Sequence, residues 1–576
     1  MFLGLILIGS IILSGTVSAA DITVTSDSNI QKAVDSANSG DTLNLQAGTY
    51  KQHNIQINKD LTIKGPYTTD SPTAIIDGQN SGSVFQILKG TSVTLQYLTI
   101  QNGNTATDSY SSDGAGIFNK GTLTVNNCII QKNTAKNGYG GGIYNYGGIV
   151  NLSNSKVISN TALNGGGIRN YNGGSVTLTG SNVYSNVATH YEGGGIDNYY
   201  SSLTLTNSNI FNNIAKGPGG GIYNYYGTVS SDYLNLYQNT AYFHGGGIYN
   251  YDGFVAFTNS NVYSNTATNG HQGGGIYNKG TFKSNYCNIF NNHADYEGGG
   301  IFNYYGTVNI IGTNLYQNTA YNFGGGLYNR HGTVTLNNSY IYSNVAKNGH
   351  GGGLGNYYEG TMIVTNCQIF NNKATNSHGA GVDNYGTRLT KLTIINSNIY
   401  KNMVINSHGG GIGNYGGTVC IINCNIYSNV AKTGHGGGIV NYNGGFITVT
   451  NSNIYSNTAY NHGGGIDNIG NSWTVIKLIG STIHNNIVKT GNGGGIYNNH
   501  GYITLNTCKV YSNKAADGGG LDNCYNGKIV LTNSSVNNNS ANKGGGGIDN
   551  YGSSSTHVTL TNTRVYSNNP SNVHGN

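Results

Sequence analysis

The sequence predicts an all-β protein, a right-handed single-stranded parallel β-helix with three strands per coil and a short helical cap at its N-terminal end. Gly-Gly-Gly-Ile-Tyr-Asn, or a near variant, recurs every 25 to 30 residues. Each copy contains three short segments of alternating apolar and polar residues, separated by Gly, Asn and Ser turns. Because strands this short cannot bury an apolar face within one repeat, the copies must stack on one another.

The repeat from Gly245 to His271 shows what each coil contributes. Stacked parallel strands ~4.8 Å apart direct Ile248, Val255, Phe257 and Val262 into a shared interior. The apolar residue of the hexapeptide marks about seventeen coils, at Ile117, Ile143, Ile168, Ile196, Ile222, Ile248, Ile276, Ile301, Leu327, Leu354, Val382, Ile412, Ile439, Ile466, Ile496, Leu521 and Ile548.

Residues 1–20 have the pattern of a secretory signal peptide. An apolar run from Phe2 to Leu13 is followed by the small residues Val17-Ser18-Ala19 of a cleavage site. The usual basic residue is missing, so an uncleaved N-terminal anchor is the alternative. No second apolar run of about twenty residues follows, and we expect a secreted or cell-surface protein without another membrane span.

Residues 21–103 differ from the array and are expected to form a cap with the first coils. Residues 29–38 predict a short amphipathic helix, followed by strands over 42–45, 54–57, 61–63, 74–76 and 93–100. A solenoid needs such a cover because open strand edges recruit other chains. Residues 104–576 are the glycine-rich array, and its end lacks a comparable cap. We expect that end to pair with a partner, or the sequence to be a fragment.

The repeated Gly and Asn residues have structural interpretations. The glycine triplet predicts a corner where a positive φ, or a close approach of neighbouring coils, excludes a Cβ. The Asn after Ile-Tyr, as in Asn145, Asn224 and Asn498, has the same facing as the Ile. Stacked copies are expected to form an interior amide ladder.

Composition narrows the class of partner. Charged residues are only 8% of the chain, Gly numbers 92 and Tyr 46, and the net charge of +6 is spread over isolated Lys and Arg residues. Ordered β structure fits this composition, and nucleic acid is not an expected partner.

Two motifs carry a resemblance to known families. Gly-Gly-x-Ile with apolar-x-x-Asn-x-Ala, as in Val183-Tyr-Ser-Asn186-Val-Ala188, resembles the repeats of the chlamydial polymorphic outer membrane proteins. The leader with residues 30–49 resembles the adhesin-like β-helix proteins of methanogenic archaea more closely. The resemblance implies a pectate-lyase-like (pectin lyase-like) β-helix on the cell exterior with a role in adhesion. The barrel domain that follows the chlamydial repeats is absent from this sequence.

A β-helix also serves polysaccharide lyases and hydrolases, whose chemistry needs a local cluster of acids. Five Asp residues replace the Tyr of the hexapeptide, a position expected to face solvent: Asp197, Asp383, Asp467, Asp522 and Asp549. Only Asp522 and Asp549 fall in adjacent coils, and a solvated surface pair is the favoured interpretation. No catalytic residue and no cofactor is predicted.

Histidine and cysteine offer further chemistry. Five histidines precede the glycine triplet in successive coils and predict a surface ladder at ~4.8 Å spacing: His350, His378, His408, His435 and His462. The ladder could bind a transition metal, although tolerated loop residues are the favoured interpretation. Five cysteines occupy a small-residue position in coils that are not neighbours, so disulfides are not expected: Cys128, Cys287, Cys367, Cys424 and Cys508.

The remaining candidate surface consists of aromatic columns. Tyr after the hexapeptide Ile, and again in Asn-x-Tyr-Ser-Asn, is expected to face outward beside amides, where it suits sugars or a partner protein. The candidates at the first position are Tyr144, Tyr223, Tyr249, Tyr277, Tyr328 and Tyr497. The sequence favours a non-enzymatic adhesin-like protein that attaches to glycans or proteins of another cell or to its own envelope. A polysaccharide lyase or glycoside hydrolase and a structural envelope component are the alternatives.

Overall fold

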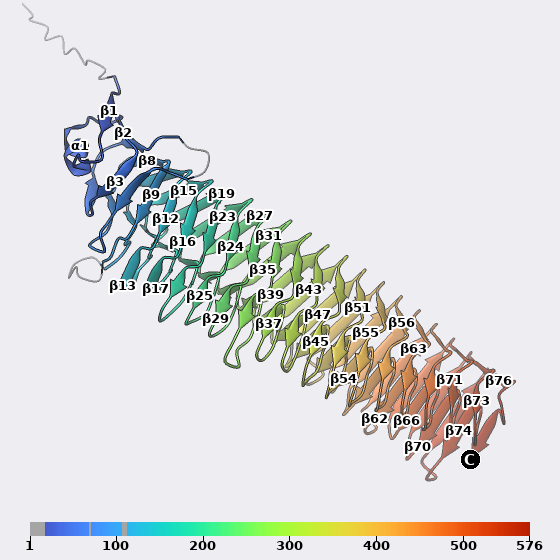
Figure 1. Cartoon of the computed structure of the whole chain (residues 1–576). Helices are drawn as coiled ribbons and strands as arrows, with labels where there is room; N and C mark the ends of the chain where they lie inside the picture. Colours follow the sequence, from blue (N-terminus) through green and yellow to red (C-terminus); the bar gives the residue numbers. More distant parts are fainter. Residues whose placement is uncertain (1–17, 68–70, 106–111, 576) are drawn as a thin grey trace, which may run out of the picture.

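The chain forms one long parallel β-solenoid of about 19 turns (Figure 1). The computed structural model describes residues 18–67, 71–105 and 112–575. The predicted signal segment, residues 1–20, lies outside the described residues except for its last three. None of the helical structure within the described ranges is long and apolar enough to cross a bilayer.

Each coil of the array contains four strands, as the coil beginning at Ile301 illustrates. Its strands are β38 (Ile301–Tyr304), β39 (Thr307–Ile311), β40 (Asn314–Tyr316) and β41 (Thr319–Ala320). Each pairs in parallel with the equivalent strand of the next coil, for example Ile301 with Leu327. The sequence predicted three strands per coil. The fourth strand escaped prediction because two residues are too few to show alternation.

The equivalent strands of successive coils build four ladders, numbered here in chain order. Ladder 1 runs from β10 (Ile117–Asn119) to β74 (Ile548–Tyr551) and is extended by β77 (Val573–Gly575). Ladder 2 runs from β11 (Thr122–Asn126) to β75 (His557–Thr561), and ladder 3 from β12 (Ile129–Gln131) to β76 (Arg564–Tyr566). Ladder 4 runs from β13 (Thr134–Tyr139) to β73 (Ser540–Ala541).

The interior is one continuous apolar core. Ile248, Val255, Phe257 and Val262 are all at most 1% exposed, which confirms their predicted inward facing. The same cluster of buried side chains extends from the N-terminal strands to Ile548. Every coil therefore depends on its neighbours for burial of its apolar residues.

The corners are made by residues in the left-handed region and by the glycine triplet. Asn259 (φ 48°) turns the chain between ladders 2 and 3, and Ser264 (φ 55°) turns it between ladders 3 and 4. In the triplet, Gly245 has a φ of +69°, and a Cβ on Gly247 would lie 2.6 Å from the carbonyl oxygen of Gly275. Both predicted reasons for glycine therefore hold.

Two buried amide ladders run along the interior. Asn224 donates through Nδ2 to Oδ1 of Asn250 at 2.8 Å, and Asn250 donates in the same way to Asn278, which confirms the predicted ladder. A second ladder follows ladder 3, where Asn239 donates through Nδ2 to Oδ1 of Asn265 at 3.0 Å. Oδ1 of Asn265 also accepts the backbone N–H of Asn239 at 3.1 Å, so this side chain satisfies the corner backbone.

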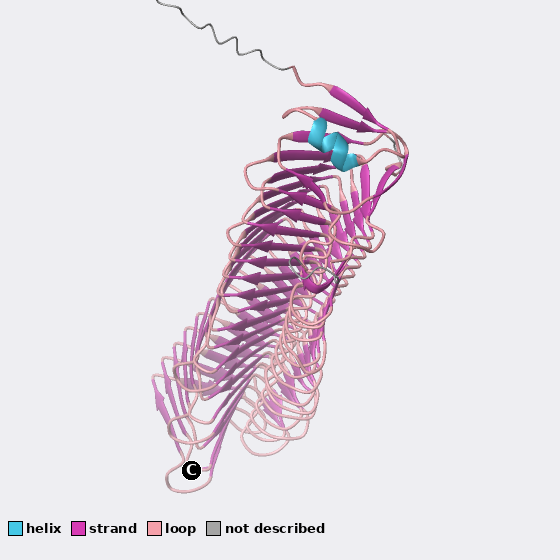
Figure 2. Cartoon of the chain, turned by 90° about the vertical axis from the view of Figure 1, so that its left-hand side faces the viewer, coloured by secondary structure: helices cyan, strands magenta, loops and turns pink. Residues whose placement is uncertain are grey.

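The N-terminal segment contains one helix and nine strands, within the ranges described. Helix α1 (Ile30–Ser36) lies where it was predicted, at the N-terminal end of the rod (Figure 2). The side chain of Asn29 accepts the backbone N–H of Lys32 at 2.9 Å and caps the helix. The strands are β1 (Asp21–Val24), β2 (Thr42–Leu45), β3 (Gly48–Lys51), β4 (Ile55–Ile57), β5 (Leu61–Lys64), β6 (Ala74–Asp77), β7 (Phe85–Ile87), β8 (Ser92–Gln96) and β9 (Leu98–Gln101).

One strand prediction in this segment was wrong in its extent. Residues 93–100 were predicted as a single strand, whereas the structure has β8 and β9 with Tyr97 between them. Tyr97 has a φ of 53° and forms a corner. An aromatic residue gives no sequence signal for the left-handed region, which favours Gly and Asn.

Candidate binding surface

The predicted outward Tyr column of ladder 1 is covered rather than exposed, which corrects the prediction. Five of its six candidates are between 1% and 8% exposed, and Tyr249 is half-buried. The five are Tyr144, Tyr223, Tyr277, Tyr328 and Tyr497.

The cover is the segment that precedes each glycine triplet. The ring of Phe323, directly before Gly324, lies 5.8 Å from the ring of Tyr328 and 5.5 Å from that of Tyr357. These side chains belong to a second apolar cluster outside the solenoid interior. The column points away from the core, as predicted, but the returning chain excludes solvent from it.

The Asp residues of the same column are buried too, so their predicted solvent exposure was wrong. Asp197 is 1% exposed and forms an ion pair with Arg169 at 2.6 Å. Burial raises the pKa of Asp197 to about 7. Asp383 is fully buried and accepts a hydrogen bond from the hydroxyl of Tyr357 at 2.5 Å. Asp467 is fully buried as well.

Asp522 and Asp549 pair in adjacent coils as predicted, but they do not form a solvated pair. They are 0% and 4% exposed. Burial raises the pKa of Asp522 well above its usual range, and the nearby carboxylates of Asp549 and Asp517 add to the effect. Nδ1 of His574 lies 2.7 Å from Oδ1 of Asp549. These carboxylates are covered and cannot reach a polymer lying on the rod surface.

The five-histidine ladder has the predicted register, with successive ring centroids 5.2, 5.4, 4.6 and 4.8 Å apart. Two of the five rings accept hydrogen bonds from the backbone. Nδ1 of His408 accepts the N–H of His435 at 3.0 Å, and Nδ1 of His462 accepts the N–H of Asn492 at 3.2 Å. Burial, together with the neighbouring imidazoles, lowers the pKa of His408 to about 3.

A metal role for this ladder stays a prediction without structural support. Within residues 18–67, 71–105 and 112–575, no three His, Cys, Asp or Glu side chains are grouped so as to hold a metal ion. Burial lowers the pKa of His435 to about 4, so its ring is neutral near pH 7. His408 and His462 act instead as hydrogen-bond acceptors for the backbone of the next coil.

One contact near this ladder combines the residue types of a hydrolytic relay, and sequence reasoning missed it. Oγ of Ser377 lies 2.7 Å from Nε2 and 3.0 Å from Nδ1 of His350, and Oδ2 of Asp383 lies 3.4 Å from Nδ1. A relay places the hydroxyl and the carboxylate on opposite ring nitrogens. Here Oγ reaches both nitrogens and shares Nδ1 with the carboxylate, so no nucleophile and base are aligned.

All seven cysteines are free thiols, and six of them are buried. Burial raises the pKa of the Cys128 thiol to about 12, which makes it unreactive. Cys420 is half-buried. The cysteines act as small core side chains rather than as a site.

The second predicted aromatic stripe, on the outer face of ladder 3, is continuous and partly exposed. Neighbouring rings are 4.6 to 5.0 Å apart and between 1° and 7° from parallel. Thirteen rings form this column: Tyr184, Phe211, Tyr237, Tyr263, Phe290, Tyr316, Tyr342, Phe370, Tyr400, Tyr427, Tyr455, His484 and Tyr511.

A row of amides runs beside these rings. Nδ2 of Asn235 donates to Oδ1 of Asn209 at 2.9 Å, and Asn261 donates to Asn235 at the same distance. The rings and amides together are called the ladder 3 wall below. From β20 (Asn182–Tyr184) to β68 (Lys509–Tyr511), the only formal charges at its outward positions are Lys509 and His484 when protonated.

The stacking decides what the ladder 3 wall can offer a ligand. Each ring face is covered by the next ring, so only ring edges, hydroxyls and amides meet solvent. The Tyr hydroxyls are protonated at neutral pH and can both donate and accept, and partial burial, reinforced by Tyr237, raises the pKa of Tyr263 further. The wall therefore presents a hydrogen-bonding motif repeated at the coil spacing, and it suits a periodic, largely uncharged partner.

Comparison with known proteins adds only a general likeness. No protein-family model and no curated protein matches this chain. A pectin methylesterase from Aspergillus niger is 13% identical at a TM-score of 0.24, over 46% of this chain and 84% of that one. The pectate lyase Pel9A is 15% identical at 0.26, over 56% and 75%, and the alginate lyase AlyGC is 10% identical at 0.23, over 95% and 100%. Likeness at this level assigns no activity to the chain.

Proposed function

We propose that this chain is a non-enzymatic, secreted or cell-surface attachment protein that binds glycans or proteins through the ladder 3 wall. The observation that carries the proposal is the continuous column of thirteen rings beside its amide row. The adhesive role implied by the resemblance to methanogen adhesin-like proteins agrees with it.

The wall favours many weak contacts over one strong one. A single coil offers a ring edge, a hydroxyl and an amide that is already engaged with its neighbour. A partner that engages several coils together gains affinity through effective concentration without any strong single contact. Partners with repeated hydroxyl groups, such as glycans on another cell or on the own envelope, fit this surface.

The buried carboxylates support attachment over polysaccharide cleavage. Lyases and hydrolases place their acids against a glycosidic bond. The five Asp residues of the ladder 1 column lie beneath the returning chain, at most 4% exposed. A substrate chain would have to displace that cover before it reached any of them.

Removing hydroxyls from the wall tests the proposal. Binding of the full chain to arrays of glycans and whole cells should fall at least tenfold when Tyr263, Tyr316 and Tyr342 are changed together to Phe, which keeps the stacking. The control Thr333→Ser on the outer face of ladder 2 should bind as the original chain does. Equal binding by the triple variant, or release of soluble fragments from a polysaccharide, would contradict the proposal. Binding to its own envelope alone would favour a structural envelope role.

We also propose that α1 caps the open end of the rod. Ile30 and Val34 are fully buried and belong to the interior cluster. Deleting residues 21–38 should expose the first coil and produce concentration-dependent oligomers in light scattering. A variant that stays monomeric would show that α1 is dispensable for this role.

A further inference from the structure

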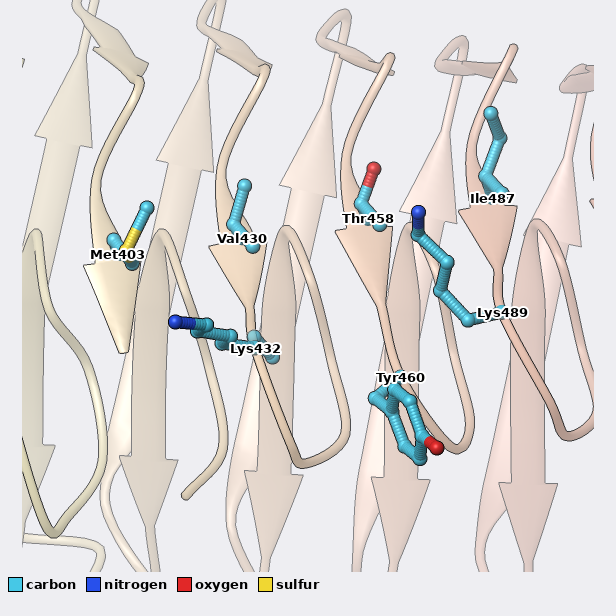
Figure 3. Close-up of a pocket in the computed structure, with 8 residues that line it drawn as sticks. Met403, Val430, Lys432, Thr458, Tyr460, Ile487 and Lys489 are labelled. Carbon is cyan, nitrogen blue, oxygen red and sulfur yellow. The ribbon is translucent and has the colours of Figure 1, made fainter. Parts of the chain in front are cut away.

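A groove runs along the outer face of ladder 4 in the C-terminal half of the rod (Figure 3). Its floor has one side chain per coil, from the paired strands β53 (Met403–Val404), β57 (Val430–Ala431), β61 (Thr458–Ala459) and β65 (Ile487–Val488). A second row of side chains lies beside the floor, two residues further along each coil. The lining residues are Met403, Val430, Ala431, Lys432, Thr458, Tyr460, Ile487 and Lys489.

The groove exposes three large apolar side chains, two on its floor and Tyr460 in the second row. Met403 is 39% exposed, Ile487 is 42% exposed and Tyr460 is 46% exposed. Figure 3 shows Met403, Val430, Thr458 and Ile487 in one row, one on each strand. A contiguous apolar strip with a polar margin is typical of a binding site.

The margin of this strip is positively charged. Lys432 and Lys489 belong to the second row. The strand register places Lys373 next to Met403 at one end of the floor and Lys514 next to Ile487 at the other. The apolar floor is therefore bounded by lysines at both ends and along one side.

No carboxylate forms an ion pair with these lysines in the part of the chain that the structure describes, and Asp517, three residues after Lys514, has Lys543 and His574 as its cationic neighbours. Glu359, Asp383 and Asp467 are the only acidic residues between residues 345 and 514. Asp383 and Asp467 are buried, and Glu359 follows the ladder 1 strand β46 (Leu354–Tyr357). Among the ion pairs of the described residues, none involves a lysine of the groove.

We propose that this groove binds an acidic polysaccharide chain that lies parallel to the rod axis. Five coil spacings separate Lys373 from Lys514, a span of ~24 Å at ~4.8 Å per coil, which suits an extended polymer better than a small anion. The C–H faces of the sugar rings lie on the aliphatic floor and against Tyr460, and the acidic groups meet Lys432 and Lys489.

The side chains favour a polysaccharide over a single-stranded nucleic acid. Nucleic-acid channels stack successive bases on several aromatic side chains. This groove has one aromatic residue, Tyr460, among its lining residues. The site lies on ladder 4 and is separate from the largely uncharged ladder 3 wall, so neither proposal depends on the other.

Charge removal at matched positions tests the groove. Titration calorimetry of the full chain with polygalacturonate, dextran sulfate and neutral dextran at low salt should show binding of the two acidic polymers only. Lys432→Gln with Lys489→Gln should weaken that binding at least tenfold. Lys391→Gln with Lys477→Gln removes the same charge from the outer face of ladder 2 and should change the affinity less than twofold.

The apolar floor has its own test. Met403→Ser with Ile487→Ser leaves the charge unchanged and should still weaken binding of polygalacturonate severalfold. Absence of binding to either acidic polymer, or equal losses in the two lysine pairs, would overturn the proposal. Single-stranded DNA bound as tightly as polygalacturonate would reassign the groove to nucleic acid. Thermal unfolding of each variant confirms that the fold is intact.

Discussion

Removing one side chain from the second buried amide ladder should loosen the rod locally, and Asn318→Ala is the sharpest case. Oδ1 of Asn318 accepts the backbone N–H of Asn292 at 3.1 Å and its Nδ2 at 3.0 Å. Nδ2 of Asn318 donates to the carbonyl of Ile289 at 2.8 Å and to Oδ1 of Asn344 at 3.0 Å. The substitution therefore removes hydrogen bonds to the two neighbouring coils at once.

The size of the effect follows from these contacts. Four buried hydrogen bonds at about 1 kcal/mol each give a loss of about 4 kcal/mol. Because Asn318 is fully buried, water cannot replace them without opening the junction. At about 1.4 kcal/mol per factor of ten, the local opening equilibrium should rise about 1,000-fold.

Hydrogen exchange followed by mass spectrometry measures this opening directly, with amides of residues 289–295 and 315–320 as the readout. The control is Asn314→Ala in the same coil. Its Nδ2 donates to Oδ1 of Asn288 at 2.9 Å on the half-buried outer face, where water can substitute. The control should raise exchange less than about threefold, in keeping with ~0.5 kcal/mol for a surface change. Equal exchange in the two variants would refute the structural role of the buried ladder.

Three further outcomes follow from buried groups. Burial lowers the pKa of His408 to about 3 in the folded chain, against 6.5 for a free imidazole. The contribution of the neutral His408 ring to stability is therefore complete above pH 6.5 and is lost as the pH falls toward 3. His435 is buried in the same way and adds its own loss of stability at low pH. The fall in the free energy of unfolding between pH 7 and pH 5, measured with urea, should therefore be about 2 kcal/mol smaller in His408→Asn than in the original chain, and an equal fall in both would contradict this. Cys420 is half-buried and the other six thiols are buried. Ellman's reagent should therefore modify one thiol per native chain and seven after denaturation. Rapid reaction of several thiols in the native chain would disprove the burial of the six. Arg169→Met should lower the free energy of unfolding by about 3–5 kcal/mol, because it leaves the buried Asp197 unpaired. Arg169→Met combined with Asp197→Leu should recover most of this stability. An equal loss of stability in the two variants would exclude the ion-pair explanation.

The facing of each strand residue and the spacing of the stacked columns could be predicted from the sequence, because both depend only on alternation within strands and on the register between coils. Ile248 and Asn250 share a facing two residues apart, and the structure buries both. Stacking of identical repeats then fixed the spacing of the histidine ladder and of the column that includes Tyr263. These features follow from parallel pairing of equivalent residues, which the recurring hexapeptide already implies.

Exposure could not be predicted in the same way. Alternation states that Tyr328 and Asp383 point away from the core, but not whether another segment covers them. The cover depends on how the chain between ladder 4 and the glycine triplet folds back, where Phe323 gives only a weak signal. The ladder 4 groove was missed for a related reason, since two-residue strands such as Met403–Val404 show no period.

Two in-register deletions test the central claim, that attachment is shared among repeated coils of the ladder 3 wall. Deleting residues 222–326 joins Gly221 to Leu327, and deleting residues 354–465 joins Gly353 to Ile466. Each removes four coils and four rings of the column, although only the second removes most of the lysine groove. For a partner that binds the wall, biolayer interferometry should show the same partial loss of affinity in both deletions. Complete loss in one deletion with full binding in the other would place attachment at a single discrete site and contradict the account.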